Sequence, residues 1–96
     1  MSGYNGWRNW ETWNTNLWYG DYLSEYYLEL FREGELTSPV EAENVKDIIE
    51  SLIFDCGDVP ENGFIADLVN GAMSEVDWRE IASHVEDAIK YEMENA

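Results

Sequence analysis

The sequence predicts an all-α protein, a compact bundle of about five short helices that forms a single acidic domain over residues 1–96. Apolar residues recur every three or four positions in most segments, as on one face of an amphipathic helix. No segment alternates apolar and polar residues over the length of a strand. Neither an internal repeat nor an interdomain linker divides the chain, so one domain is expected.

The first half of the chain predicts two helices, over about residues 9–19 and 22–33. Asn9 can cap the first helix, because an asparagine side chain accepts hydrogen bonds from the free amides of a first turn. Gly20 is expected to break that helix, and Asp21 to cap the next one.

The strongest pattern for a helix start lies at Ser38. Pro39 follows at the first helical position and Glu41 at the third, which together form a capping box with a preset backbone angle. The helix that follows carries an apolar stripe expected to face the core, formed by Val45, Ile48, Ile49, Leu52 and Ile53. The loop 55–63 contains glycine, aspartate and proline and should end this helix.

Two further helices complete the predicted bundle. Apolar residues from Phe64 to Met73 mark the fourth, although Gly71 weakens it by about 1 kcal/mol relative to alanine. Asp77 is placed to cap the last helix, with Glu80 at its third position.

The composition describes a folded and extremely acidic chain. Apolar residues make up 45% and aromatic residues 15%, which is too much for a disordered chain. The 21 acidic residues outweigh five basic ones, so the formal net charge is −16. Nucleic-acid binders need lysine and arginine to displace counterions from phosphates, and anionic lipids are repelled in the same way. We therefore expect a basic protein as partner and no direct binding to nucleic acid or to a membrane.

No group of residues predicts catalysis, a cofactor or a metal site. His84, the single histidine, shares a helical face with Glu80 and Asp87, which suits a surface histidine paired with carboxylates. A transition-metal site usually needs more nitrogen or sulfur ligands than His84 and Cys56. That lone cysteine fits a reducing compartment, and the first residues lack a signal peptide, so a cytoplasmic protein is expected.

A line of carboxylates is the main candidate for partner binding. Asp21, Glu25, Glu29 and Glu33 recur every four residues, so each lies about 6 Å further along a helix axis. Like charges at this spacing repel by a few tenths of a kcal/mol per pair. The stripe could stand in for the phosphates of a nucleic-acid strand. The alternative is a solvated helix face without a partner.

Three more residues extend the candidate surface. Trp7 precedes the first helix and is expected to be the exposed member of the tryptophan cluster, where an indole can anchor a partner. Glu43 and Asp47 add carboxylates on the third predicted helix. The alternative for the tryptophans is that they pack within the core.

Two segments of the chain have a distinctive pattern. Residues 5–18 read N-G-W-R-N-W-E-T-W-N-T-N-L-W, and residues 76–82 read V-D-W-R-E-I-A. They resemble a family of small uncharacterised proteins, common in bacteriophages and mobile elements, whose start reads roughly N-x-x-x-N-W-x-x-W-N-x-x-L-W. The family often has Asn-Asp-Glu near Gly20, where only Asp21 matches here. The resemblance implies a phage or mobile-element origin, hence the host-cell cytoplasm, and brings no activity with it.

These observations predict a non-catalytic acidic binding protein. The first hypothesis is a phage-encoded nucleic-acid mimic that inhibits a DNA- or RNA-binding protein of the host, such as a restriction or CRISPR-type defence protein. The second is an interaction or adaptor module of a phage or mobile element whose acidity serves solubility only. Salt-sensitive binding to a basic host protein would separate the two.

Overall fold

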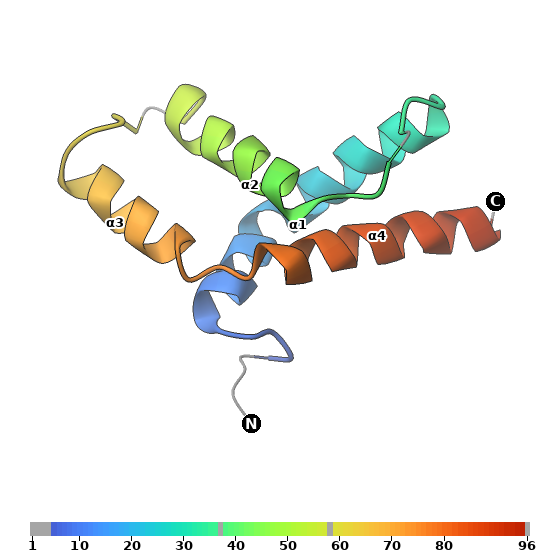
Figure 1. Ribbon diagram of the computed structural model, residues 1–96, viewed down its shortest axis with the longest axis horizontal. Coiled ribbons are helices and arrows are strands. Elements are labelled where there is room, and N and C mark those ends of the chain that lie inside the picture. Colours follow the sequence, from blue (N-terminus) through green and yellow to red (C-terminus); the bar gives the residue numbers. More distant parts are fainter. Residues whose placement is uncertain (1–4, 37, 58, 96) are drawn as a thin grey trace.

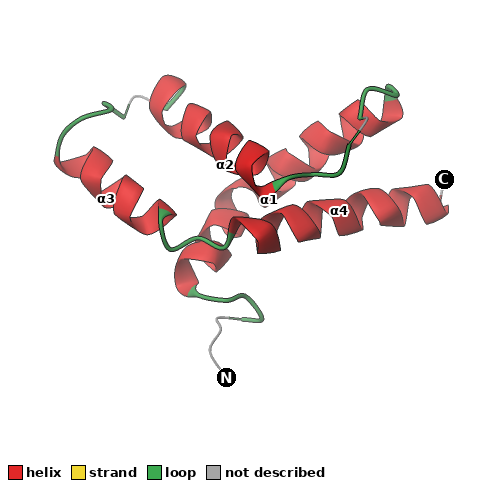
Figure 2. Ribbon diagram, viewed as in Figure 1, coloured by secondary structure: helices red, strands yellow, loops and turns green. Residues whose placement is uncertain are grey.

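The computed structural model describes residues 5–36, 38–57 and 59–95. Within these ranges the chain forms α1 (Trp10–Arg32), α2 (Ala42–Glu50), the π-helical turn η1 (Ser51–Asp55), α3 (Phe64–Met73) and α4 (Trp78–Asn95) (Figure 1). Figure 2 shows helices and loops and no strand among the described residues. The all-α prediction is therefore confirmed, with four α-helices in place of about five.

The predicted helix break at Gly20 is wrong, because α1 runs through it as one helix of 23 residues. A glycine inside a helix costs about 1 kcal/mol, whereas a helix end would leave several backbone groups to be capped. Leu23 and Tyr27, one turn and two turns further on, are buried and hold the second half of α1 on the core. Asp21 therefore caps nothing and lies on the helix surface.

The capping box predicted at Ser38 does not form. The residue before α2 is Glu41, which is extended (φ −107°, ψ 143°) and makes no side-chain cap. Val40 is buried instead, and its backbone N–H donates to the Glu86 carboxylate of α4. A partner from a distant part of the chain satisfies this amide, so the segment stays extended and the helix begins three residues later than predicted.

The core lies where α4 packs against α1 and α2. Its buried side chains are Leu23, Tyr27, Val40, Val45, Ile49, Met73, Val76, Ile81, Ala82, Val85 and Ile89. The predicted stripe of the third helix is confirmed, since Val45 and Ile49 are fully buried while Ile48, Leu52 and Ile53 pack against the core. From α3 itself, Met73 belongs to this core, and Ala66 is also buried.

The molecule is flat. Its extents are 46 × 35 × 18 Å and its radius of gyration is 14.3 Å, somewhat above the about 12 Å expected for a compact domain of this length. α3 lies at one edge, away from the right-hand ends of α1 and α4 in Figure 1. Much of the surface of α1 and α3 consequently faces solvent. None of the described helices combines the length and apolarity needed to cross a membrane.

Candidate partner-binding surface

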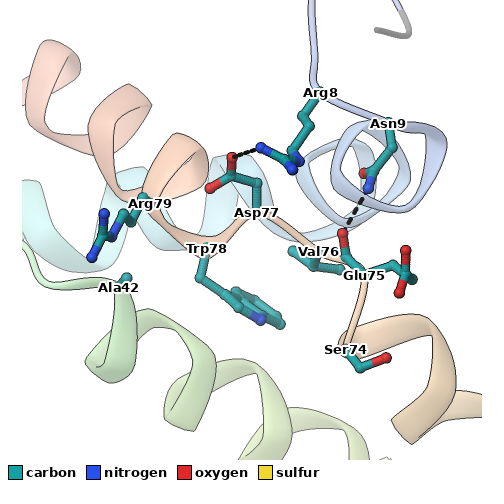
Figure 3. A pocket seen from close by; sticks show the side chains of 9 residues that line it. All are labelled: Arg8, Asn9, Ala42, Ser74, Glu75, Val76, Asp77, Trp78 and Arg79. Carbon is teal, nitrogen blue, oxygen red and sulfur yellow. Dashed lines mark hydrogen bonds and ion pairs between the residues drawn. The ribbon is translucent and has the colours of Figure 1, made fainter. Parts of the chain in front are cut away.

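The two distinctive segments of the sequence meet where α1 and α4 begin. Asn9 caps α1 as predicted, because its Oδ1 accepts from Thr12 N at 2.9 Å and from Thr12 Oγ1 at 2.6 Å. The buried Thr12 hydroxyl in turn accepts from Asp77 N at 2.8 Å. Asn9 Nδ2 donates to the Glu75 carbonyl at 2.7 Å (Figure 3). One cap thus also joins the start of α1 to the start of α4, through bonds between residues 66 and 65 positions apart in the sequence.

Charged groups tighten the same junction. Asp77 caps α4 as predicted, its Oδ1 accepting from Glu80 N at 3.2 Å. Asp77 Oδ2 lies 3.8 Å from Arg8 Nη1, and Arg8 N donates to Glu80 Oε1 at 2.9 Å. The carboxylates of Asp77 and Glu80 therefore bind groups of this chain.

An open cleft of about 620 Å³ lies over this junction (Figure 3). Its polar groups are largely engaged within the fold. Trp78 Nε1 donates to the Met73 carbonyl at 3.3 Å, and Ser74 Oγ donates to the Gly71 carbonyl at 2.7 Å. The cleft is consequently a feature of the helix junction and offers few free groups to a ligand.

Trp7 is partly buried and stacks on His84, with ring centroids 4.1 Å apart and planes inclined by 26°. The prediction that Trp7 is the exposed member of the tryptophan cluster is wrong, because Trp18 is 74% exposed. The pairing expected between His84 and Glu80 is replaced by this stacking, while Glu80 accepts from the Arg8 amide.

The predicted carboxylate stripe lies on the solvent side of α1. Asp21, Glu25 and Glu29 are exposed along the helix, and Glu33 is exposed as the residue that ends it. Because α1 is continuous, the carboxylates keep their spacing of about 6 Å along its axis. Trp7, which precedes α1 and stacks on α4, stands apart from this stripe.

Aromatic side chains share the face with these carboxylates. Trp18 is 74% exposed and Tyr22 is 49% exposed, and positions 18, 22, 25 and 29 follow the helical spacing i, i+4, i+7, i+11. The Tyr22 ring also stacks on that of Tyr26, with centroids 6.4 Å apart. We call the surface formed by Trp18, Asp21, Tyr22, Glu25 and Glu29 the outer face of α1.

Sequence reasoning missed the two aromatic members of the outer face. The expected break at Gly20 placed Trp18 and Glu25 on different helices, so the sequence did not predict that their side chains share one helix face. The pattern that could have shown this shared face is the helical spacing of Trp18, Tyr22 and Glu29 across the glycine.

The arginine closest in sequence to the stripe is bound by another helix. Arg32 Nε and Nη2 donate to the two carboxylate oxygens of Glu92 on α4, at 2.6 and 2.7 Å. This hydrogen bonding is the main reason that the pKa of Arg32 is raised and the pKa of Glu92 is lowered. The negative charges of Glu25 and Glu29 raise the pKa of Arg32 further. With Arg32 held by Glu92, the outer face of α1 stays strongly negative.

The α2 carboxylates lie on another part of the surface. Glu43 and Asp47 are exposed one helical turn apart, and Asp47 borders a hollow of about 370 Å³ that Tyr26 and Tyr27 also line. Burial raises the pKa of the Tyr27 hydroxyl, and its neighbour Tyr26 adds to the effect. The structure therefore brings Asp47 close to the aromatic residues of α1, with Glu43 one turn away.

The described ranges contain no group of three or more histidine, cysteine, aspartate and glutamate side chains that could hold a metal ion. The chain as a whole matches the sequence model of a family of unknown function, DUF7249, over residues 1–95. The chain belongs to this family. No curated protein and no solved structure matches it.

The DUF7249 match covers both the helix junction and the outer face of α1. It establishes the family and assigns no function to either feature. The chemistry of the exposed groups therefore has to support any functional proposal.

Proposed function

We propose that this protein is a non-catalytic acidic binding protein that covers the nucleic-acid-binding surface of a basic partner protein. The observation that carries the proposal is the outer face of α1. There, exposed carboxylates at intervals of about 6 Å lie beside the exposed rings of Trp18 and Tyr22.

Neither component of this face contributes much to the fold, although Glu25 and Glu29 attract Arg32. The carboxylates repel one another at the i, i+4 spacing, and a tryptophan that is 74% exposed gains little from packing within its own chain. On a partner, the carboxylates would pair with lysine and arginine, which speeds association and selects basic surfaces. The aromatic rings would supply the few contacts that dominate binding energy at protein interfaces.

The partner we propose is a host DNA- or RNA-binding protein, of the restriction or CRISPR type. Such proteins hold phosphates in basic channels, where a line of carboxylates can replace the nucleic acid. The phage or mobile-element origin implied by the sequence pattern supports this class of target, and we propose that the protein acts in the host cytoplasm. The net charge of −16 argues against competition by binding the nucleic acid itself.

The test is competition for DNA binding. The purified protein is added to restriction and CRISPR-type effector proteins, and their binding to fluorescent DNA is followed at increasing salt. We expect loss of DNA binding for at least one effector, with an inhibition that weakens as salt rises. A gel shift of the same DNA by the protein alone would contradict the proposal.

The matched variants remove the same charge from different places. Glu25→Gln with Glu29→Gln should weaken inhibition and flatten its salt dependence, because two charge contacts are lost. Glu61→Gln with Asp87→Asn neutralises two exposed carboxylates outside α1 and should change inhibition little. Equal effects of both pairs would mean that only net charge matters, which favours an interaction or adaptor module whose acidity serves solubility.

A further inference from the structure

α3 presents apolar side chains on two opposite sides. Ala66 and Met73 are buried. On the other side, Phe64 is 75% exposed, Ile65 52% and Leu68 55%. Large apolar side chains of a helix normally face the core, so this second side of α3 lacks a cover.

The charge distribution favours contact between copies at this helix. α3 carries one charged residue, Asp67, in a chain whose net charge is −16. Asp67 lies about 100° around the helix from Leu68 and so flanks the exposed apolar side. Two copies that met through the outer face of α1 would bring carboxylates together, whereas two α3 helices can meet with little repulsion.

The exposed side of α3 is also complementary to itself. It has a large ring at its start, Phe64, a leucine at its middle, Leu68, and small residues at its end, Gly71 and Ala72. Apart from its chain neighbours and the adjacent backbone of α3, nothing lies within 4 Å of the place that a β-carbon of Gly71 would occupy, so that end is open. If two such helices pack antiparallel about a two-fold axis at Leu68, each Phe64 faces the Gly71 and Ala72 of the other copy.

We propose that the exposed side of α3 binds the same side of a second copy of this chain, in an antiparallel two-fold dimer. This arrangement uses one surface on both copies, as closed symmetric dimers do. The ten residues of α3 span only about 15 Å. A contact of that length falls below the about 1,200 Å² of a stable interface, so the dimer is weak and reversible. Because each copy carries −16, added salt strengthens it.

Sedimentation equilibrium of the full chain, over a concentration series at low and high salt, measures this association. We expect a monomer–dimer equilibrium whose dissociation constant falls as salt rises. Leu68→Glu should raise that constant at least tenfold, while Leu17→Glu, the same change at a 60% exposed leucine of α1, should not. A monomer under every condition, or equal effects of the two variants, would overturn the proposal.

A second variant separates dimerisation from folding. Gly71→Gln fills the place proposed for the partner's Phe64 and also removes a glycine from a helix, which should stabilise the monomer against unfolding. We expect a higher melting temperature together with weaker dimerisation. Unchanged association in this variant would contradict the antiparallel packing.

Cross-linking tests the two-fold axis directly. In a Cys56→Ser background, Leu68→Cys places the two thiols at the axis, whereas Phe64→Cys places them at opposite ends of the contact. Mild oxidation should give a disulfide-linked dimer for Leu68→Cys and far less for Phe64→Cys. Efficient linkage through position 64 would indicate parallel helices and overturn the arrangement.

Discussion

The outer faces of α1 and α3 are both exposed and chemically opposite. On α1, carboxylates lie beside aromatic rings, and on α3 most exposed side chains are apolar. The outer face of α1 suits a basic partner, because opposite charges attract across an interface. The exposed side of α3 suits an apolar partner, because burial of apolar surface stabilises the contact. An extreme net charge therefore does not describe every part of a protein surface. A −16 chain can still keep one helix nearly uncharged.

The largest expected effect separates buried from exposed apolar residues. Ile49→Ala should lower the free energy of unfolding by about 2–5 kcal/mol, because Ile49 is 1% exposed and the truncation leaves a cavity. Leu68→Ala should change it by about 0.5 kcal/mol or less at concentrations where the chain is monomeric. Urea unfolding of both variants measures the difference. A large loss for Leu68→Ala would mean that α3 is covered within its own chain.

A smaller effect tests whether the outer face of α1 is one surface. Gly20→Ala should raise the free energy of unfolding by about 1 kcal/mol or slightly less, because alanine is the better helix former. The Asn16 side chain, whose Oδ1 lies 2.5 Å from the new β-carbon position, must move, but it is flexible. Urea unfolding measures the change. A clear loss of stability would indicate a helix break at this glycine and would separate Trp18 from Glu25.

A pH-dependent effect tests whether Glu92 of α4 holds Arg32, the arginine beside the outer face of α1, in an ion pair. The Arg32 hydrogen bond lowers the pKa of Glu92 below its usual 4.5. The contribution of this pair to the free energy of unfolding is therefore present above the unfolded-state pKa of Glu92. It is lost as the pH falls through the lowered pKa of the folded state. Glu92→Gln should lower the melting temperature slightly at neutral pH and leave it unchanged in more acidic solution. Glu94→Gln is the control, and a difference that persists at every pH would contradict the assignment.

The smallest effect concerns the carboxylates themselves. Glu25→Gln with Glu29→Gln should leave the melting temperature equal or raise it slightly, because a like-charge pair costs only a few tenths of a kcal/mol. Thermal unfolding followed by circular dichroism measures it. A lower melting temperature would show that these carboxylates stabilise the fold, in part through Arg32, and would weaken the case that they serve a partner.

Much of the local structure could be predicted. The helical class, the caps at Asn9 and Asp77 and the buried pair Val45 and Ile49 follow from side-chain chemistry and spacing within a few residues. Such features depend on residues a few positions apart in the chain, so the sequence itself shows the groups that interact.

The two wrong boundaries, at Gly20 and Ser38, share one physical cause. Each pattern predicted that residues close in sequence would end or cap a helix. Contacts with distant segments stabilise a different backbone conformation in both places. Burial of Leu23 and Tyr27 offsets the cost of a glycine inside α1. The Glu86 carboxylate accepts the Val40 amide and so replaces the capping box.

The sequence by itself therefore determined the class of the fold, the helix caps at Asn9 and Asp77 and the sign of the charge, because these depend on composition and on residues a few positions apart. The tertiary structure alone decided that Trp18 and Tyr22 share a helix face with Glu25 and Glu29, and that one side of α3 stays uncovered. Both outcomes depend on how far a helix continues and on what packs against it. The length of a helix and its packing are decided by the balance, over the whole chain, between the free energy gained by burying apolar side chains and the free energy lost in fixing the backbone.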